Sequence, residues 1–238
     1  MTTKRKILEL SNIYKTYSMG DVVTNALNGV DLEVNYGEII VILGSSGSGK
    51  TTLLNVLSGL DRPTSGKIYF DGRDITRYSE GRITKFRKDN LGFIFQTYNL
   101  LEHLNVIENV KVGAKLGKNR GSVNSILATV GLEKHAKKYM HELSGGEQQR
   151  VSIARALAKN PKIMFADEPT GALDEETGKR VLRALITANE KMKTTMIIVT
   201  HNPGIALIGD RIIRVNSGEI TSIVSNNERT APEEIPWG

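Results

Sequence analysis

Residues 44–51, Gly-Ser-Ser-Gly-Ser-Gly-Lys-Thr, have the residue types and spacing of a phosphate-binding loop. Its glycines let the backbone turn N–H groups toward phosphate oxygens, and a helix that follows adds free donors at its N-terminus. Lys50 can place a positive charge against the β- and γ-phosphates of a nucleotide, and the hydroxyl of Thr51 can bind Mg²⁺. An apolar strand before the loop and a helical pattern over residues 50–60 disfavour an accidental glycine-rich turn. We therefore expect a nucleotide to contact Gly44, Ser45, Ser46, Gly47, Ser48, Gly49, Lys50, Thr51 and Thr52.

Two adjacent carboxylates, Asp167 and Glu168, follow an apolar run that begins at Ile163. In a parallel sheet, ligands bind beyond the carboxyl ends of the strands. Asp167 would hold Mg²⁺ through water, and Glu168 could polarise the water that attacks a phosphate. Adjacent acids are common on protein surfaces, but their place at the end of a buried strand, downstream of a phosphate loop, indicates a catalytic site.

A third motif, Leu143-Ser144-Gly145-Gly146-Glu147, opens an amphipathic helix. Ser144 and Glu147 have the spacing of a capping box, so the motif could be no more than a well-capped helix. That account leaves the two glycines unexplained, because glycine weakens a helix. We interpret them as a way to let an anion touch the bare helix N-terminus.

The elements that must position these residues follow from hydrophobic patterning. Alternation predicts half-buried strands over 6–10 and 30–34, and continuous apolar runs predict buried strands over 39–43, 162–167 and 196–200. A helix over 175–193 lies between the last two strands, which implies a parallel sheet covered by helices. Residues 211–224 read as a hairpin that turns at 216–218. Residues 97–160 carry mostly helical signals, and we expect them to form a helical insertion in an α/β fold.

Composition excludes several classes of protein. The 238 residues are 39% hydrophobic and 24% charged, which is ordinary for a globular protein and not for a disordered one. The absence of cysteine excludes disulfide scaffolds, thiol catalysis and iron–sulfur clusters. No apolar run approaches the roughly 20 residues of a membrane span, and no signal peptide is evident. We expect a soluble, cytoplasmic chain that reaches a membrane only through a partner.

Together, the three motifs resemble the nucleotide-binding subunit of an ABC transporter, and the resemblance covers residues 6–222. It implies a single domain over 1–238 with a P-loop NTPase (RecA-like) core, an N-terminal antiparallel β subdomain and an inserted α-helical subdomain. The core would comprise 1–96 and 161–224, and the helical subdomain with its signature motif would comprise 97–160. Residues 225–238 would be a tail, either a loose terminus or a docking peptide.

The resemblance also implies roles for single residues. Tyr17 resembles the aromatic residue that stacks on adenine, and Gln96 the glutamine that senses Mg²⁺ and joins the core to the helical subdomain. Asp174 ends a loop, 171–174, that resembles the one crossing to the opposite subunit. His201 resembles the histidine that contacts the γ-phosphate. The site residues implied across the subunit boundary are Ser144, Gly145 and Gly146. The other histidines, His103, His135 and His141, match no motif and would be solvated or structural.

The same resemblance implies partners and a mechanism. Two copies of the chain would bind two ATP molecules head to tail, each between the phosphate loop of one copy and the signature of the other. Hydrolysis, with Glu168 as the base and Mg²⁺ as the cofactor, would reopen the dimer and drive an integral membrane permease. The chain would therefore be peripheral on the inner face of the cell membrane, and no direct contact with nucleic acid is expected.

Details at Gly171, 59–66 and 95–100 resemble the cassettes of lipoprotein release, macrolide export and antimicrobial-peptide transport. An amino-acid-type importer subunit is the alternative within transporters. A non-transport ABC ATPase acting on nucleic acid or ribosomes is less favoured, because the chain has one cassette and no heptad insertion. Tyr98, Leu100 and Leu101 would line the groove for the permease, although some of them must pack the helical subdomain.

The positive charge of the chain is concentrated in one segment. Residues 81–142 hold eleven Lys and Arg against five Asp and Glu, a net charge of +6 that equals the net charge of the whole chain. A solvated helix surface is the commonest reason for such charge. The alternative is a face directed at anionic lipid headgroups or acidic permease loops.

Overall fold

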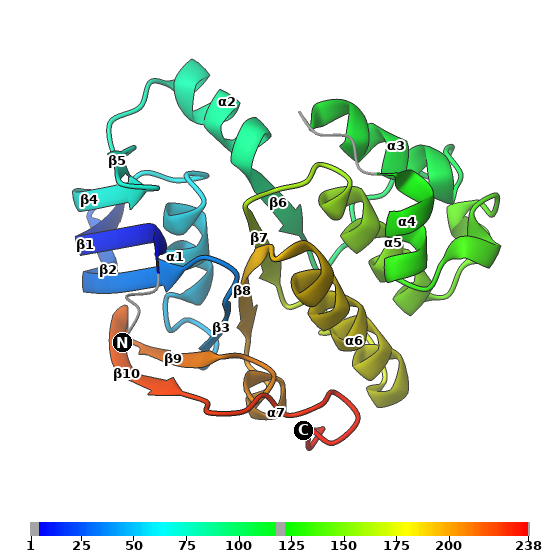
Figure 1. The fold of residues 1–238 in the computed structure, drawn as a ribbon. Helices are drawn as coiled ribbons and strands as arrows, with labels where there is room; N and C mark the ends of the chain where they lie inside the picture. Colours follow the sequence, from blue (N-terminus) through cyan, green and yellow to red (C-terminus); the bar gives the residue numbers. More distant parts are fainter. Residues whose placement is uncertain (1–4, 118–121, 238) are drawn as a thin grey trace.

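The computed structural model describes residues 5–117 and 122–237, which form two β-sheets and the helices around them (Figure 1). The strands are β1 (Lys6–Met19), β2 (Val22–Asn35), β3 (Ile39–Leu43), β4 (Ser65–Phe70), β5 (Arg73–Asp74), β6 (Leu91–Ile94), β7 (Ile163–Asp167), β8 (Thr195–Thr200), β9 (Arg211–Asn216) and β10 (Glu219–Ser225). The helices are α1 (Lys50–Leu57), α2 (Glu80–Asn90), α3 (Val106–Leu116), α4 (Val123–Thr129), α5 (Gly145–Leu157), α6 (Glu175–Met192) and α7 (Pro203–Ala206), with 3₁₀ turns η1 (Glu133–His135) and η2 (Met140–Glu142).

The larger sheet has the strand order β10-β9-β3-β8-β7-β6. Its strands β3, β8, β7 and β6 are parallel, β9 is parallel to β3, and the edge strand β10 is antiparallel to β9. The carboxyl ends of β3, β7 and β8 therefore meet at one edge, so the residues that follow these strands lie close together. The parallel sheet and the 211–224 hairpin predicted from the sequence are confirmed.

Strand β3 shows why its residues are continuously apolar. Ile39 and Val41 belong to a core shared with α5 and α6, whereas Ile40 and Ile42 belong to a second core shared with α1 and the smaller sheet. All five residues of the strand are buried because helices or strands cover both of its faces (Figure 1).

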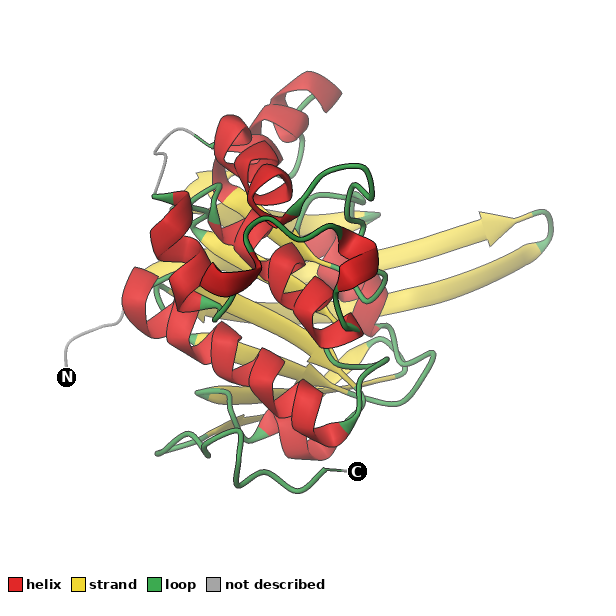
Figure 2. Cartoon of the chain, turned by 90° about the vertical axis from the view of Figure 1, so that its right-hand side faces the viewer, coloured by secondary structure: helices red, strands yellow, loops and turns green. Residues whose placement is uncertain are grey.

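The smaller sheet is antiparallel, with the order β2-β1-β4-β5. Strands β1 and β2 have 14 residues each, longer than the short strands expected from the sequence, and Figure 2 shows their outer half projecting from the molecule. Residues near its turn, including Met19, Val22 and Val23, are exposed. The projecting half has no buried face to impose an alternating pattern, which is why the sequence did not reveal it.

Helices α3, α4 and α5 pack on the side of the larger sheet opposite α1 (Figure 1). Helix α3 approaches α5 closely at two glycines one turn apart. A side chain on Gly113 would overlap the backbone carbonyl of Arg155, and one on Gly117 would lie 2.5 Å from the carbonyl of Lys159. The backbones of α3 and α5 therefore lie in direct contact at these two glycines. Helix α2, which leads into β6, was not foreseen from the sequence.

The C-terminal segment packs on the molecule, so the expectation of a loose terminus is wrong for residues 226–237. Ile235 is 2% exposed, and the ring of Trp237 covers Gly178 on α6. Arg229 donates hydrogen bonds of 2.8 and 2.6 Å to the two carboxylate oxygens of Asp210. Glu233 forms an ion pair with Arg183.

Lys118 and Arg120 of the basic segment lie outside the described residues. Within the described ranges, Arg82, Lys85, Lys88, Lys111 and Lys115 are exposed on α2 and α3. None of the helices in these ranges combines the length and apolar character needed to cross a bilayer.

Candidate active site

The phosphate loop connects β3 to α1 in a conformation that depends on glycine. Gly49 has a φ of 101°, which favours glycine, and a side chain there would lie 2.7 Å from the carbonyl of Ala26. The Nζ of Lys50 donates a 2.6 Å hydrogen bond to the carbonyl of Ser45, so the lysine folds back over the loop. The N–H of Gly218, in the β9–β10 turn, donates to the carbonyl of Ser48 at 2.9 Å and holds the loop from outside.

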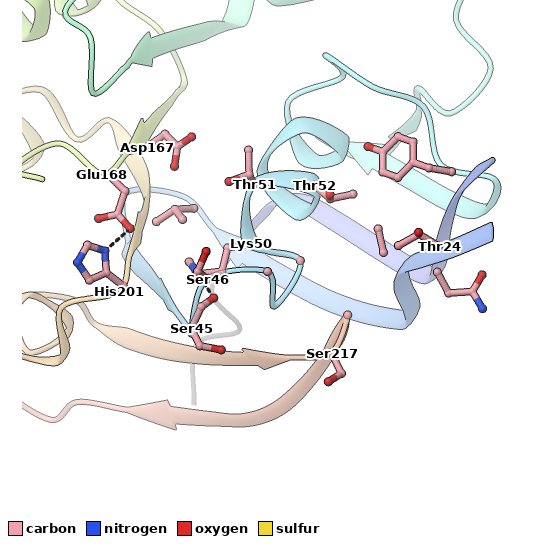
Figure 3. A pocket seen from close by; sticks show the side chains of 17 residues that line it. Thr24, Ser45, Ser46, Lys50, Thr51, Thr52, Asp167, Glu168, His201 and Ser217 are labelled. Atoms are coloured by element: carbon pink, nitrogen blue, oxygen red, sulfur yellow. Dashed lines mark hydrogen bonds and ion pairs between the residues drawn. The ribbon is translucent and has the colours of Figure 1, made fainter. Parts of the chain in front are cut away.

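A pocket of about 940 Å³ opens beside this loop (Figure 3). It gathers most of the residues expected to bind or act on a nucleotide. Those that line it are Tyr17, Ser45, Ser46, Gly47, Gly49, Lys50, Thr51, Thr52, Asp167, Glu168 and His201. Gly44 and Ser48 belong to the same loop but lie behind the pocket surface, where a side chain on Gly44 would lie 2.6 Å from Ser48 Oγ.

Two carboxylates stand at the end of β7, opposite the loop. Burial, and then the neighbouring Glu168, raise the pKa of Asp167, while Lys50 acts in the opposite direction. Glu168 Oε1 lies 2.8 Å from His201 Nδ1 (Figure 3). Glu168 Oε2 accepts a 3.2 Å hydrogen bond from Thr200 Oγ1. Strands β7 and β8 thus fix the direction of the Glu168 side chain.

The backbone of Glu168 is strained. Its φ is 45°, in the left-handed region that residues with side chains rarely occupy. A 2.9 Å hydrogen bond from its N–H to the carbonyl of Val199 holds it there. Strain of this kind persists where surrounding structure enforces it and is concentrated at functional sites.

The far wall of the pocket comes from the β1–β2 hairpin. Thr24, Asn25 and Ala26 of β2 line it beside Tyr17 of β1. The hydroxyl of Tyr17 donates to Asp61 at 2.7 Å; burial and then this carboxylate raise the pKa of Tyr17. The Nζ of Lys15 lies 4.7 Å from the centre of the Tyr17 ring. Tyr17 is 42% exposed, so a flat aromatic base could stack against its ring.

The signature residues do not line this pocket. The capping box predicted for α5 is confirmed, because Ser144 N–H donates to Glu147 at 2.8 Å and Glu147 N–H to Ser144 at 3.3 Å. Burial acts to raise the pKa of Glu147, but the hydrogen bonds with Ser144 and the nearby His135 outweigh it, so the pKa of Glu147 is lowered. His135 Nδ1 lies 3.0 Å from Glu147 Oε1, an ion-pair distance without hydrogen-bond geometry.

The two signature glycines have a packing role that the sequence did not indicate. A side chain on Gly146 would overlap the methyl carbon of Thr177 on α6. One on Gly145 would lie 3.0 Å from the Tyr98 hydroxyl. Packing against α6 therefore requires a glycine at position 146, whereas at position 145 a side chain would meet only the end of the Tyr98 side chain.

Gln96 and Asp174 also lie outside the pocket lining. Gln96 is exposed and lies next to Gly171. A Cβ atom added to Gly171 would lie 3.1 Å from Gln96 Nε2 and 3.4 Å from Glu168 Cβ, so Gly171 sits between these two side chains. Asp174 caps α6 by accepting a 3.0 Å bond from Thr177 N–H, which is the main reason that the pKa of Asp174 is lowered.

Several residues around the pocket were missed by sequence reasoning. Asp61 and Lys15 hold Tyr17, Thr200 holds Glu168, and Ser217 joins the pocket wall from the β9–β10 turn. They belong to no local motif and are brought in only by tertiary packing.

A phosphate loop at the end of a buried parallel strand, with an acidic strand end beside it, defines a P-loop nucleoside triphosphatase. Comparison with known proteins narrows the class. The family model described as ABC transporter matches residues 27–171. The chain belongs to the ABC transporter family.

Individual relatives agree with this family. The chain is 48% identical to the ABC transporter ATP-binding protein MG065 homolog of Mycoplasma pneumoniae, over 97% of this chain and 50% of that protein. It is 42% identical to the bacitracin export ATP-binding protein BceA of Halalkalibacterium halodurans, over 90% of this chain and 87% of that protein. The chain spans about half the length of the first curated relatives.

A solved structure shares the fold. It is a dimer of the ATP-binding cassette MJ0796 of Methanocaldococcus jannaschii in a post-hydrolysis state, bound to ADP and Pi. The similarity has a TM-score of 0.81 at 39% identity and covers 92% of this chain and 98% of that one.

Proposed function

We propose that the chain binds and hydrolyses ATP as the motor subunit of an ABC transporter. The observation that carries this proposal is the pocket itself, in which Lys50 and the phosphate loop face the Glu168–His201 pair (Figure 3). The phosphate loop would hold the α- and β-phosphates through backbone N–H groups, and Lys50 would leave Ser45 to contact the β- and γ-phosphates. Tyr17 would stack on the adenine ring.

Mg²⁺ fits the residues on the other side of the pocket. The Asp167 carboxylate is half-buried beside Glu168. Burial and then the neighbouring carboxylate raise the pKa of Asp167, and a divalent cation would stabilise its charged form against both. Thr51 and Asp167 would hold the ion, Asp167 through water, with Gln96 approaching when the site closes. Bound there, Mg²⁺ would neutralise charge on the phosphates.

Glu168 is the proposed base. Its carboxylate would orient a water molecule and accept its proton, while His201 would leave Glu168 Oε1 to contact the γ-phosphate. Most of the acceleration would come from positioning and charge stabilisation, because phosphoryl transfer needs little covalent help from the protein.

A second copy of the chain would complete the site. Ser144, Gly145 and Gly146 stand outside the pocket of their own chain, at a helix N-terminus that suits a phosphate. We propose a head-to-tail dimer in which these residues contact the γ-phosphate held by the partner, and in which Asp174 lies at the same seam. The dimeric cassette with 39% identity supports this arrangement.

The partner that uses the motion would be an integral membrane permease, which would hold the chain at the inner face of the membrane. Thr97, Tyr98, Leu100 and Met140 line a 400 Å³ groove on the helical side that could receive it. Leu101 lies next to this groove and is 38% exposed. The 42% sequence identity with the bacitracin export ATP-binding protein BceA supports a role in export. The substrates would be peptides, antibiotics or lipoproteins, and the permease would either export them or transmit force across the membrane to act on them. The helical subdomain at 97–160 would then be the part that moves with the permease.

Two variants test the proposed ATPase. Glu168→Gln should keep ATP affinity, lower turnover by ~10²–10⁴-fold, and give an ATP-dependent dimer on a sizing column. Lys50→Ala should weaken ATP binding itself, measured by calorimetry, because a charge-assisted contact to phosphate is lost. Normal turnover in the first variant, or unchanged ATP affinity in the second, would remove these residues from the proposed roles.

A further inference from the structure

One buried side chain on the signature helix touches both segments that carry the proposed catalytic residues. Gln149 lies in α5, five residues after Ser144, and is 0% exposed. Its Nε2 donates a 2.8 Å hydrogen bond to the carbonyl of Pro169 and a 3.4 Å bond to the carbonyl of Phe95. Two carbonyl acceptors require the amide to present its NH₂ group, so the orientation of the side chain is fixed.

The two acceptors are adjacent to functional residues. Phe95 immediately precedes Gln96, and Pro169 immediately follows Glu168. A single amide group therefore ties α5 to the backbone on which Gln96 and Glu168 are mounted. Because Gln149 is one helical turn from Gly146, any displacement of the signature must be carried to these two carbonyls or must break the bonds.

Stability alone does not account for a glutamine at this place. Its Oε1 has no hydrogen-bond partner among residues 5–117 and 122–237, although it is fully buried. A buried acceptor without a donor is unfavourable, and this cost offsets part of what the two hydrogen bonds donated by the amide contribute to stability. A group retained against this cost calls for a functional explanation.

We propose that Gln149 is a positioning residue that couples the two ATP sites of the dimer. The proposal rests on the function inferred above. In a head-to-tail dimer, the signature of a chain meets the nucleotide held by the partner, whereas Gln96 and Glu168 act on the nucleotide of their own chain. Gln149 joins these two ends inside one chain, so contact of the signature with one γ-phosphate sets the backbone position of the catalytic residues at the other site.

The test replaces the amide without changing its length. Gln149→Met removes both donors and the unpartnered acceptor, and Ser152→Ala is the matched control, because Ser152 is also fully buried on α5 with an unpartnered Oγ. We expect Gln149→Met to fold with a Tm only a few degrees below that of the wild type, because the carbonyls of Pro169 and Phe95 lose their donor. It should keep its ATP affinity within about twofold and form the ATP-dependent dimer in Mg²⁺-free buffer. Its kcat should fall at least tenfold, and the Hill coefficient for ATP hydrolysis should fall toward 1.

Other outcomes overturn the coupling role. These are a wild-type Hill coefficient of 1, unchanged kcat and Hill coefficient in Gln149→Met, the same kinetic loss in Ser152→Ala, and loss of the dimer with the kinetic defect. If Gln149→Met does not fold, Gln149→Leu is measured in the same way. A wild-type chain that hydrolyses no ATP refutes the proposed function separately, before any variant is compared.

Discussion

The second glycine of the signature allows two physical explanations to be separated by experiment. Gly146 is buried, and a side chain at this position would overlap the methyl carbon of Thr177, so α6 lies directly on the first turn of α5. The same glycine leaves a helix N-terminus open to an anion. Gly146→Ala perturbs both features, whereas the double variant Gly146→Ala/Thr177→Ser removes the obstructing methyl group and perturbs only the second.

The packing cost can be bounded. Overpacking a tight contact costs about 1–3 kcal/mol, and alanine recovers about 0.5–1 kcal/mol of helix propensity. A net loss of up to about 2.5 kcal/mol follows, which for a chain of this size lowers Tm by up to roughly 10 °C. The hydrogen bond from Thr177 N–H to Asp174 is untouched by either substitution, because it comes from the backbone.

Calorimetry of the nucleotide-free proteins checks the packing explanation, and steady-state ATPase assays check the anion explanation. We expect the double variant to recover the wild-type Tm but not the wild-type kcat. A Gly146→Ala protein that melts at or above the wild-type temperature would refute the packing argument. Full recovery of kcat in the double variant would refute the need for an uncovered helix end.

Three further predictions follow from the same structure. Asp167→Asn should raise the Tm of the ligand-free chain at neutral pH. Because the pKa of Asp167 is raised in the folded state, the stability of the wild type falls as pH rises through that pKa. Melting curves measured across pH should show this fall in the wild type and not in the variant. Trp237→Ala should cost about 2 kcal/mol, because the ring covers Gly178 but is only partly buried, and thermal melts should fall while ATP affinity stays constant. Leu101→Asp should keep ATP binding but uncouple ATPase activity from a co-purified permease; normal stimulation by the permease would contradict the groove assignment.

The sequence predicted those parts of the site whose geometry is local. The phosphate loop and the capping box of α5 are set by residue spacing within one turn or loop. The five consecutive apolar residues of β3 predict that the strand is buried on both faces. The pairing of Glu168 with His201 could not be read from the sequence, because it depends on the register of β7 beside β8.

Two segments were misjudged for a different reason. The projecting half of the β1–β2 hairpin is held by backbone hydrogen bonds with no core behind it, so it leaves no hydrophobic pattern. The C-terminal segment looks polar and proline-rich, yet Ile235 and Arg229 anchor it to the fold. In both segments a few tertiary contacts outweigh local composition.

The division of β3 between two cores bears on how the chain can move without losing its nucleotide. Ile39 and Val41 are held from the helical side, and Ile40 and Ile42 from the α1 side. The strand that leads into the phosphate loop is therefore held by two separate sets of contacts, one in each core. A permease that pulled on α3 and α5 would strain the core on the helical side of β3. The contacts of Ile40 and Ile42 on the α1 side would remain. The helices could then move while the phosphate loop kept its position around the triphosphate.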